Sequence, residues 1–160
     1  MRVHLGSDHA GFELKQHLLD WLDAQGHEVV DHGALSYDPD DDYPPFCLSA
    51  AAAVVEDGDS RASLGVVLGG SGNGEQMAAN KVHGVRAALA WSEETAALAR
   101  EHNDANVLSL GARMLAPDQA VRLVEVFLTT GFSGDSRHTR RIEMLRDYEQ
   151  TGEIPATPER

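Results

Sequence analysis

The sequence is poor in cysteine and has no long hydrophobic run. Cys47 is the single thiol among 160 residues, which excludes an intrachain disulfide framework and a zinc cluster built from cysteine ligands. No apolar stretch approaches the roughly 20 residues that a membrane-spanning helix requires. The first residues lack the hydrophobic segment of a secretory signal, because Gly6 and Asp8 interrupt them at once. We therefore expect a cytoplasmic protein without membrane contacts.

Basic residues are also scarce, with 13 Lys and Arg against 26 Asp and Glu and a formal net charge of −13. This excess of negative charge opposes binding to nucleic acid or to an anionic membrane, so we expect neither as a partner. Four arginines nevertheless fall within ten positions: Arg137, Arg140, Arg141 and Arg146. A local cluster of this kind can still attract a small anion.

Short apolar segments alternate with amphipathic segments along the chain, which is typical of an α/β fold with a parallel sheet. Residues 64–68 are almost entirely apolar, as expected for a strand buried on both faces. We expect a Rossmann-like, three-layer α/β/α sandwich with a five-stranded parallel sheet. The expected strands are 3–5, 28–31, 64–68, 85–91 and 107–110, and the expected helices are 12–24, 46–55, 76–81, 92–102, 117–130 and 137–150.

This fold predicts where a ligand binds. Residues 1–150 make a single domain in this interpretation, and residues 151–160, with Pro155 and Pro158, a flexible tail. Ligands of doubly wound folds bind beyond the carboxyl ends of the strands. Polar turns follow three of the expected strands, at residues 7–9, 69–75 and 111–113.

The glycine-rich turn at 69–75 is the most informative of the three. Four glycines in six positions let the backbone amides approach a ligand, and an anion or a developing oxyanion suits them. Ser71 adds a hydroxyl group and Glu75 a carboxylate. The turn matches neither the P-loop nor the dinucleotide-binding pattern. The alternative is a flexible turn with a solvated Glu75.

The ionisation of Glu75 is open at this point. A helix N-terminus lowers the pKa of a carboxyl group, whereas desolvation raises it. A catalytic base that works near neutral pH needs the second effect to prevail.

Two histidine-containing turns offer further candidates. Asp8 and His9 follow the first strand and can orient a sugar hydroxyl or a phosphate, unless Asp8 simply caps the next helix. His102 and Asn103 end another helix, where His102 is a possible general acid or base. The alternative for His102 is a histidine that stabilises the helix C-terminus.

The remaining candidate residues could bind an anion or a cation. Arg137 and Arg141 are four residues apart and share one helix face, which suits a phosphate, although ordinary surface ion pairs would use the same residues. The acidic run at 38–42 lacks the pattern of an EF-hand, so we expect a solvated loop there. Tyr43 follows that run and can wall a pocket, and Cys47 fits a small core position.

Three segments together resemble the B-type ribose-5-phosphate isomerases, a family that also contains allose- and galactose-6-phosphate isomerases. They are residues 6–15 (GSDHAGFELK), the glycine-rich turn continuing through Ala78-Ala79-Asn80-Lys81, and residues 102–108 (HNDANVL). The resemblance covers about residues 2 to 150. It implies isomerisation of ribose 5-phosphate and ribulose 5-phosphate through a cis-enediolate, without a metal or another cofactor.

The resemblance also implies roles for single residues. Glu75 is the base, and His102 opens the furanose ring. Ser71 and the amides of the turn stabilise the enediolate. The other implied contacts are with sugar hydroxyls, the phosphate or the pocket wall, and they involve Asp8, His9, Tyr43, Gly70, Gly72, Asn73, Gly74, Asn103, Arg113, Arg137 and Arg141. Family members share the site between the two subunits of a homodimer, so the neighbour is expected to supply His102 and Asn103, with Arg113 as a further candidate.

One departure from the family pattern is informative. Many members carry a cysteine base at the position that here is Gly69, and this sequence instead resembles the branch in which a glutamate serves. Two alternatives stay open: an isomerase of a six-carbon sugar phosphate such as allose 6-phosphate, and a non-catalytic module that binds a phosphate group or a nucleotide.

Overall fold

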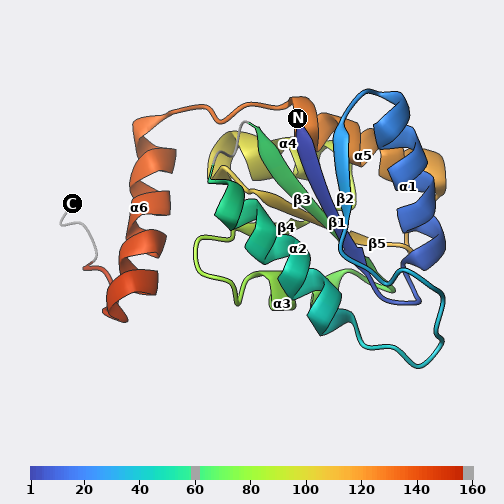
Figure 1. Ribbon diagram of the computed structural model, residues 1–160. Helices are drawn as coiled ribbons and strands as arrows, with labels where there is room; N and C mark the ends of the chain where they lie inside the picture. Colours follow the sequence, from blue (N-terminus) through green and yellow to red (C-terminus); the bar gives the residue numbers. More distant parts are fainter. Residues whose placement is uncertain (59–61, 157–160) are drawn as a thin grey trace.

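The computed structural model describes residues 1–58 and 62–156 and has the predicted three-layer architecture, with helices on both faces of one parallel sheet (Figure 1). The strand order is β2-β1-β3-β5-β4. Chain order therefore reverses between β1 and β3, and these two strands pair in parallel from Arg2↔Ser63 to Ser7↔Leu68. The strands are β1 (Arg2–Ser7), β2 (Glu28–Asp31), β3 (Ser63–Gly69), β4 (Ala87–Leu89) and β5 (Val107–Gly111).

Alternating residues of the sheet pack into two hydrophobic cores. Leu64, Val66 and Leu68 of β3 belong to the core beneath α1 (Phe12–Ala24), α4 (Glu93–Asn103) and α5 (Pro117–Thr129). Val67 points to the opposite core, beneath α2 (Tyr43–Asp57) and α3 (Asn73–Ala79). Every residue of β3 is buried, which confirms the prediction made from its apolar sequence.

Several boundaries differ from the sequence prediction. Helix α2 begins at Tyr43, three residues before the expected start, because proline is tolerated in the first helical turn and Pro44 and Pro45 stand there. Helix α3 begins at Asn73 and so includes part of the glycine-rich turn. Strand β4 is only three residues long and pairs with β5 alone at the edge of the sheet.

Helix α6 (Ser136–Thr151) stands apart from the sheet, joined to α5 by an extended segment (Figure 1). His138 is the one residue of this helix that is fully buried. The helix ends at Gly152, whose φ of 73° is the left-handed conformation that glycine adopts readily. Part of the expected tail, residues 157–160 with Pro158, lies outside the described residues. In the described parts of the chain, no helix has both the length and the hydropathy to cross a membrane.

Candidate active site

A pocket of about 460 Å³ opens at the carboxyl ends of β1 and β3, where the strand order reverses. The pairing of Ser7 with Leu68, and of Gly69 with Gly111, brings the three polar turns together at one edge of the sheet. Eight of the predicted site residues line this pocket: Asp8, His9, Tyr43, Gly70, Ser71, Gly74, Glu75 and Arg113.

Glu75 is the third residue of α3, and only 4% of its surface is exposed. Desolvation raises the pKa of its carboxyl group, and the negative charge of Asp8 acts in the same direction. Hydrogen bonds from the backbone N–H groups of Glu75 and Gly72 act in the opposite direction, but burial prevails. The structure therefore resolves the question that the sequence left open, and Glu75 is not a solvated residue.

The glycine-rich turn is held by short polar contacts. Ser109 of β5 donates its hydroxyl hydrogen to the carbonyl oxygen of Gly72 at 2.7 Å. Gly72 has a φ of 82°, which allows the turn to enter α3 abruptly. The hydroxyl oxygen of Ser71 accepts hydrogen bonds from the backbone and side-chain nitrogens of Asn73, at 3.4 and 3.2 Å. Gly70, Ser71, Gly74 and Glu75 of this turn thus line one pocket.

Tyr43 and Arg113 complete the pocket from two other elements. A Cβ added at Gly74 would lie 2.8 Å from the Tyr43 hydroxyl oxygen, so the aromatic ring depends on glycine there. A Cβ at Gly70 would lie 3.3 Å from a guanidinium nitrogen of Arg113, which follows β5. Arg113 therefore belongs to the same protomer as Glu75 in this pocket, and a neighbour is not needed to supply it.

Asp8 does not cap α1, as one interpretation of the sequence had it. The N-cap residue of α1 is Gly11, and the Asp8 Oδ1 atom instead accepts a hydrogen bond from the Ala10 backbone nitrogen at 3.0 Å. Asp8 is 7% exposed and lies in the pocket wall close to Glu75.

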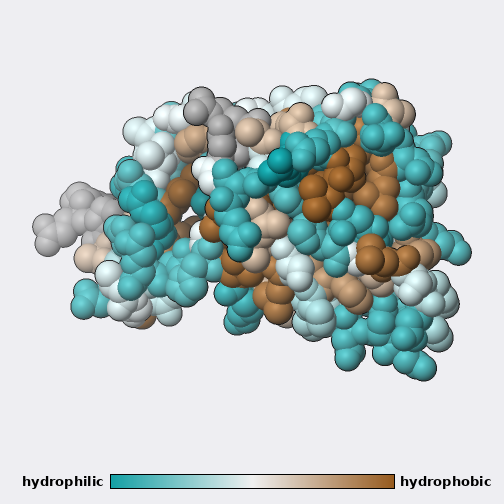
Figure 2. Space-filling model, in the orientation of Figure 1, coloured by the Kyte–Doolittle hydropathy of each residue, from teal (hydrophilic) through white to brown (hydrophobic). Residues whose placement is uncertain are grey.

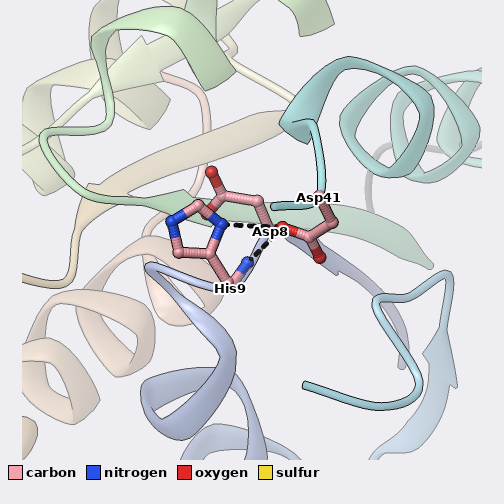
Figure 3. A group of neighbouring side chains, drawn as sticks. All are labelled: Asp8, His9 and Asp41. Atoms are coloured by element: carbon pink, nitrogen blue, oxygen red, sulfur yellow. Dashed lines mark hydrogen bonds and ion pairs between the residues drawn. The ribbon is translucent and has the colours of Figure 1, made fainter. Parts of the chain in front are cut away.

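The acidic run is not the fully solvated loop that the sequence predicted. Asp38, Asp40 and Asp42 are exposed, but the Asp41 side chain is only 10% exposed. Its Oδ1 atom accepts hydrogen bonds from the backbone nitrogen and the ring Nδ1 of His9, each at 2.8 Å (Figure 3). The potential ligand atoms of Asp8, His9 and Asp41 lie within 4.8 Å of one another, so this group is also where a cation would find three ligands.

Cys47 lies in the core beneath α2 and has no exposed surface. Burial raises the pKa of its thiol, and the nearby charges of Glu75 and Asp8 raise it further. The thiol is therefore protonated and unreactive, which confirms the core assignment.

Six predicted residues do not line this pocket in the same chain: Gly72 and Asn73, which belong to the glycine-rich turn beside it, and four residues on α4 and α6. His102 and Asn103 are the last residues of α4, and Arg137 and Arg141 lie one turn apart on α6. Arg137 is exposed and forms a surface ion pair with Asp135 at 3.6 Å.

His138 is a neighbour of His102 that the sequence did not single out. The ring centroids of His102 and His138 are 4.2 Å apart, and His138 Nδ1 lies 2.8 Å from the Ser133 hydroxyl oxygen. Desolvation, together with the charge of His102, lowers the pKa of His138. Its place inside the arginine cluster was the available signal in the sequence.

A second and larger cavity of about 970 Å³ separates α6 from the edge strand β4. Ile142, Leu145 and Tyr148 line it from the helix, and Leu89 and Trp91 line it from the body of the protein. Figure 2 shows hydrophobic residues beside this hollow. Leu145, Tyr148 and Trp91 are 60%, 50% and 63% exposed, so the hollow is an apolar surface that this chain leaves uncovered.

Comparisons with known proteins agree with this fold. The family model described as Ribose/Galactose Isomerase matches residues 3–145. The chain is 58% identical to ribose-5-phosphate isomerase B of Mycolicibacterium paratuberculosis, over 99% of this chain and 98% of the relative. It also matches the crystal structure of ribose-5-phosphate isomerase B from Mycoplasma genitalium with bound ribulose-5-phosphate, at 42% identity and a TM-score of 0.89, over 94% and 97% of the two chains. The structure of the type B enzyme from Trypanosoma cruzi gives 37% identity and a TM-score of 0.87, over 95% and 98%. Sequence and fold thus agree along almost the entire chain, which belongs to the ribose/galactose isomerase family.

Proposed function

We propose that this protein is an aldose–ketose isomerase that interconverts D-ribose 5-phosphate and D-ribulose 5-phosphate in the non-oxidative pentose phosphate pathway. The observation that carries the proposal is the buried Glu75 carboxyl group, which shares a pocket with His9 and Arg113. A carboxylate with a raised pKa beside cationic groups suits the abstraction of a proton from a phosphosugar. The high identity to mycobacterial ribose-5-phosphate isomerase B supports the same substrate.

Proton transfer at Glu75 is the central step. The carboxylate takes the proton from C2 of the open-chain aldose, the C–H electron pair becomes the C1–C2 double bond, and the carbonyl electrons move to O1. The resulting cis-enediolate receives the proton back from Glu75 at C1. A carbonyl forms at C2 as the O2 hydroxyl loses its proton and O1 gains one. No atom is lost and no metal or cofactor takes part.

The other pocket residues bind and polarise the substrate. The Ser71 hydroxyl and the backbone amides of Gly70, Ser71 and Gly74, which line the pocket, donate hydrogen bonds to the enediolate oxygens, where negative charge develops. Asp8 holds a sugar hydroxyl, and Tyr43 lines the pocket. His9 and Arg113 provide positive charge for the phosphate group.

A second subunit completes this site. His102, Asn103, Arg137 and Arg141 do not line the pocket of their own chain, and the apolar hollow beside α6 has no cover within one chain. A homodimer accounts for both observations, since a two-fold interface would cover the hollow twice and bring these residues to the neighbour's pocket. His102 of the partner subunit then opens the furanose ring by protonating the ring oxygen and accepting the proton of the O1 hydroxyl.

Replacing Glu75 tests the assignment of the base. We expect Glu75→Gln to lower kcat at least about a hundredfold, the lower end of what a general base contributes, while calorimetry still detects binding of ribose 5-phosphate. Glu13→Gln is the matched control, because Glu13 is also an acidic residue in the first turn of a helix but is exposed. Assays with a chelator present separate this chemistry from a metal-dependent hydride shift. Activity of Glu75→Gln close to that of the unmodified enzyme would contradict the proposal.

Substrate length and turnover distinguish this function from the two alternatives, an isomerase of a six-carbon sugar phosphate and a non-catalytic binding module. The sixth carbon of allose 6-phosphate moves the phosphate away from a fixed base, so kcat/KM is expected to favour the five-carbon substrate. A non-catalytic binding module would show no turnover, and calorimetry would show nucleotides binding at least as tightly as ribose 5-phosphate.

A further inference from the structure

The contact between His9 and Asp41 joins two segments that are 32 residues apart in the sequence. His9 follows β1, and Asp41 lies near the end of the irregular loop between β2 and α2, two residues before Tyr43. No pattern in the sequence predicts that these two residues are in contact. A single carboxylate oxygen of Asp41 accepts both the backbone N–H of His9 and the hydrogen on its ring Nδ1, each at 2.8 Å.

These two hydrogen bonds fix the ring as well as the backbone of His9. A ring that donates from Nδ1 presents Nε2 on its opposite edge, and Figure 3 shows the second ring nitrogen turned away from Asp41. His9 lines the same pocket as Glu75 and Arg113. We propose that Asp41 is a positioning residue for His9, holding the imidazole so that Nε2 binds the substrate phosphate; this inference rests on the function proposed above.

The burial of the Asp41 carboxylate is unfavourable unless its contacts with His9 compensate. Its side chain is 10% exposed, and within the described residues its Oδ2 atom is buried without a hydrogen-bond partner. Burying a carboxylate in this way costs free energy unless its other contacts compensate. The exposed neighbours Asp40 and Asp42 avoid this cost, so the turn places one particular carboxylate against His9.

The charges around His9 favour its cationic form. The hydrogen bond to Asp41 raises the pKa of His9, desolvation acts in the opposite direction, and the charge of Asp8 raises it again. Glu75 and Arg113 line the same pocket. The Tyr37 ring packs edge-on against the His9 ring, with the ring centroids 6.5 Å apart. An imidazolium with a fixed Nε2–H is a charge-assisted donor for a phosphate oxygen.

A double-mutant cycle tests whether Asp41 acts through His9. Asp41→Asn keeps the shape of the side chain and removes its charge, and Asp40→Asn removes the same charge from an exposed neighbour. His9→Asn keeps a donor near the Nδ1 position and removes Nε2. We expect Asp41→Asn to raise KM for ribose 5-phosphate by roughly 5- to 20-fold with little change in kcat, as for a weakened charge-assisted hydrogen bond. Asp40→Asn should leave KM unchanged.

The combined variant gives the deciding comparison. In a His9→Asn background, adding Asp41→Asn should raise KM no further, because the group that Asp41 holds is already absent. An equal rise in both backgrounds would overturn the proposal, as would an unchanged KM in Asp41→Asn alone.

An NMR titration of the histidine rings gives a readout that does not depend on catalysis. The His9 signal is identified as the one that His9→Asn removes, and its pKa should fall in Asp41→Asn but not in Asp40→Asn. An unchanged His9 pKa in folded Asp41→Asn overturns the positioning role. If His9→Asn has no effect on KM, the phosphate contact in the proposed function fails, and the titration still decides whether Asp41 controls His9.

Discussion

The carboxyl group of Glu75 lies where the side chain of any other residue at position 69 would have to be. A Cβ built on Gly69 overlaps the Oε1 and Cδ atoms of Glu75 and comes within 2.9 Å of its Cγ. Gly69 ends β3, and Glu75 stands in the first turn of α3, so the glycine-rich turn at 69–75 folds the helix back over the strand end. A side chain at position 69 and this position of the Glu75 carboxyl group therefore exclude each other.

This relationship gives a physical reason for the departure noted in the sequence. In the resemblance, many family members carry a cysteine base at position 69. Here the carboxyl group of Glu75 reaches into the same volume from the following helix. A cysteine side chain at position 69 and the Glu75 carboxyl group would therefore compete for one location, and the position of Glu75 in this structure requires glycine at the end of the strand.

Gly69→Ala is expected to lower activity far more than stability. The added methyl group displaces the Glu75 carboxyl group, and we expect kcat to fall at least about a hundredfold, as when a general base is lost. Far-UV circular dichroism and the melting temperature should change little, because the flexible end of one side chain can move. Gly131→Ala is the matched control, since nothing lies within 4 Å of a Cβ there. A Gly69→Ala enzyme with normal kcat would show that Glu75 works from another position.

The pH dependence of kcat/KM follows from the raised pKa of Glu75. The base acts in its ionised form, so kcat/KM falls as the pH drops through that pKa, and the acid limb lies above the value of about 4.3 for an ordinary glutamate. Asp8 contributes to the raised pKa of Glu75, so Asp8→Asn should move the acid limb to lower pH, whatever it does to KM. Asp20→Asn, which alters an exposed residue of α1, should leave the limb in place.

The sequence predicts well what depends on local periodicity and poorly what depends on the path of an irregular loop. The apolar run of β3 and the polar turns after β1, β3 and β5 were enough to predict a site at one edge of the sheet. Asp41 was missed because nothing in an acidic run tells which carboxylate folds inward. The start of α2 was missed because Pro44 and Pro45 suggest a loop when they in fact occupy a first helical turn.

Local sequence patterns alone also could not predict that His102 lies outside the Glu75 pocket of its own chain. Glu75 lies in the first turn of α3, which begins before the start that the sequence predicted, and His102 lies in the last turn of α4, as predicted. In parallel βα units, helices begin near the carboxyl ends of the strands and end near the amino ends. Glu75 and His102 therefore lie at opposite ends of the strands within one chain. Spacing along the sequence contains no information about whether a neighbouring subunit brings them together.

Arg137→Ala tests the phosphate contact attributed to α6. Arg137 is exposed and holds only a loose ion pair with Asp135, so its loss should cost little stability. If it binds the phosphate of the neighbour's substrate, KM should rise roughly tenfold while kcat changes little, because a ground-state contact is removed. Arg140→Ala removes the same charge from an adjacent exposed position and should leave KM unchanged. Equal effects of the two variants would indicate a general loss of positive charge.

Mixing two inactive variants tests the shared site directly. Glu75→Gln and His102→Asn should each inactivate a homodimer, since every site in it lacks one group. In a mixed dimer, one site combines both defects, and the other combines an intact Glu75 with an intact His102 of the partner subunit. Random exchange makes half of the dimers mixed, so the mixture should regain about a quarter of the activity of the unmodified enzyme. Refolding the two variants together and assaying ribose 5-phosphate isomerisation gives the measurement, with each variant refolded alone as the control. A mixture that stays inactive although native mass spectrometry shows mixed dimers would mean that Glu75 and His102 serve the same chain.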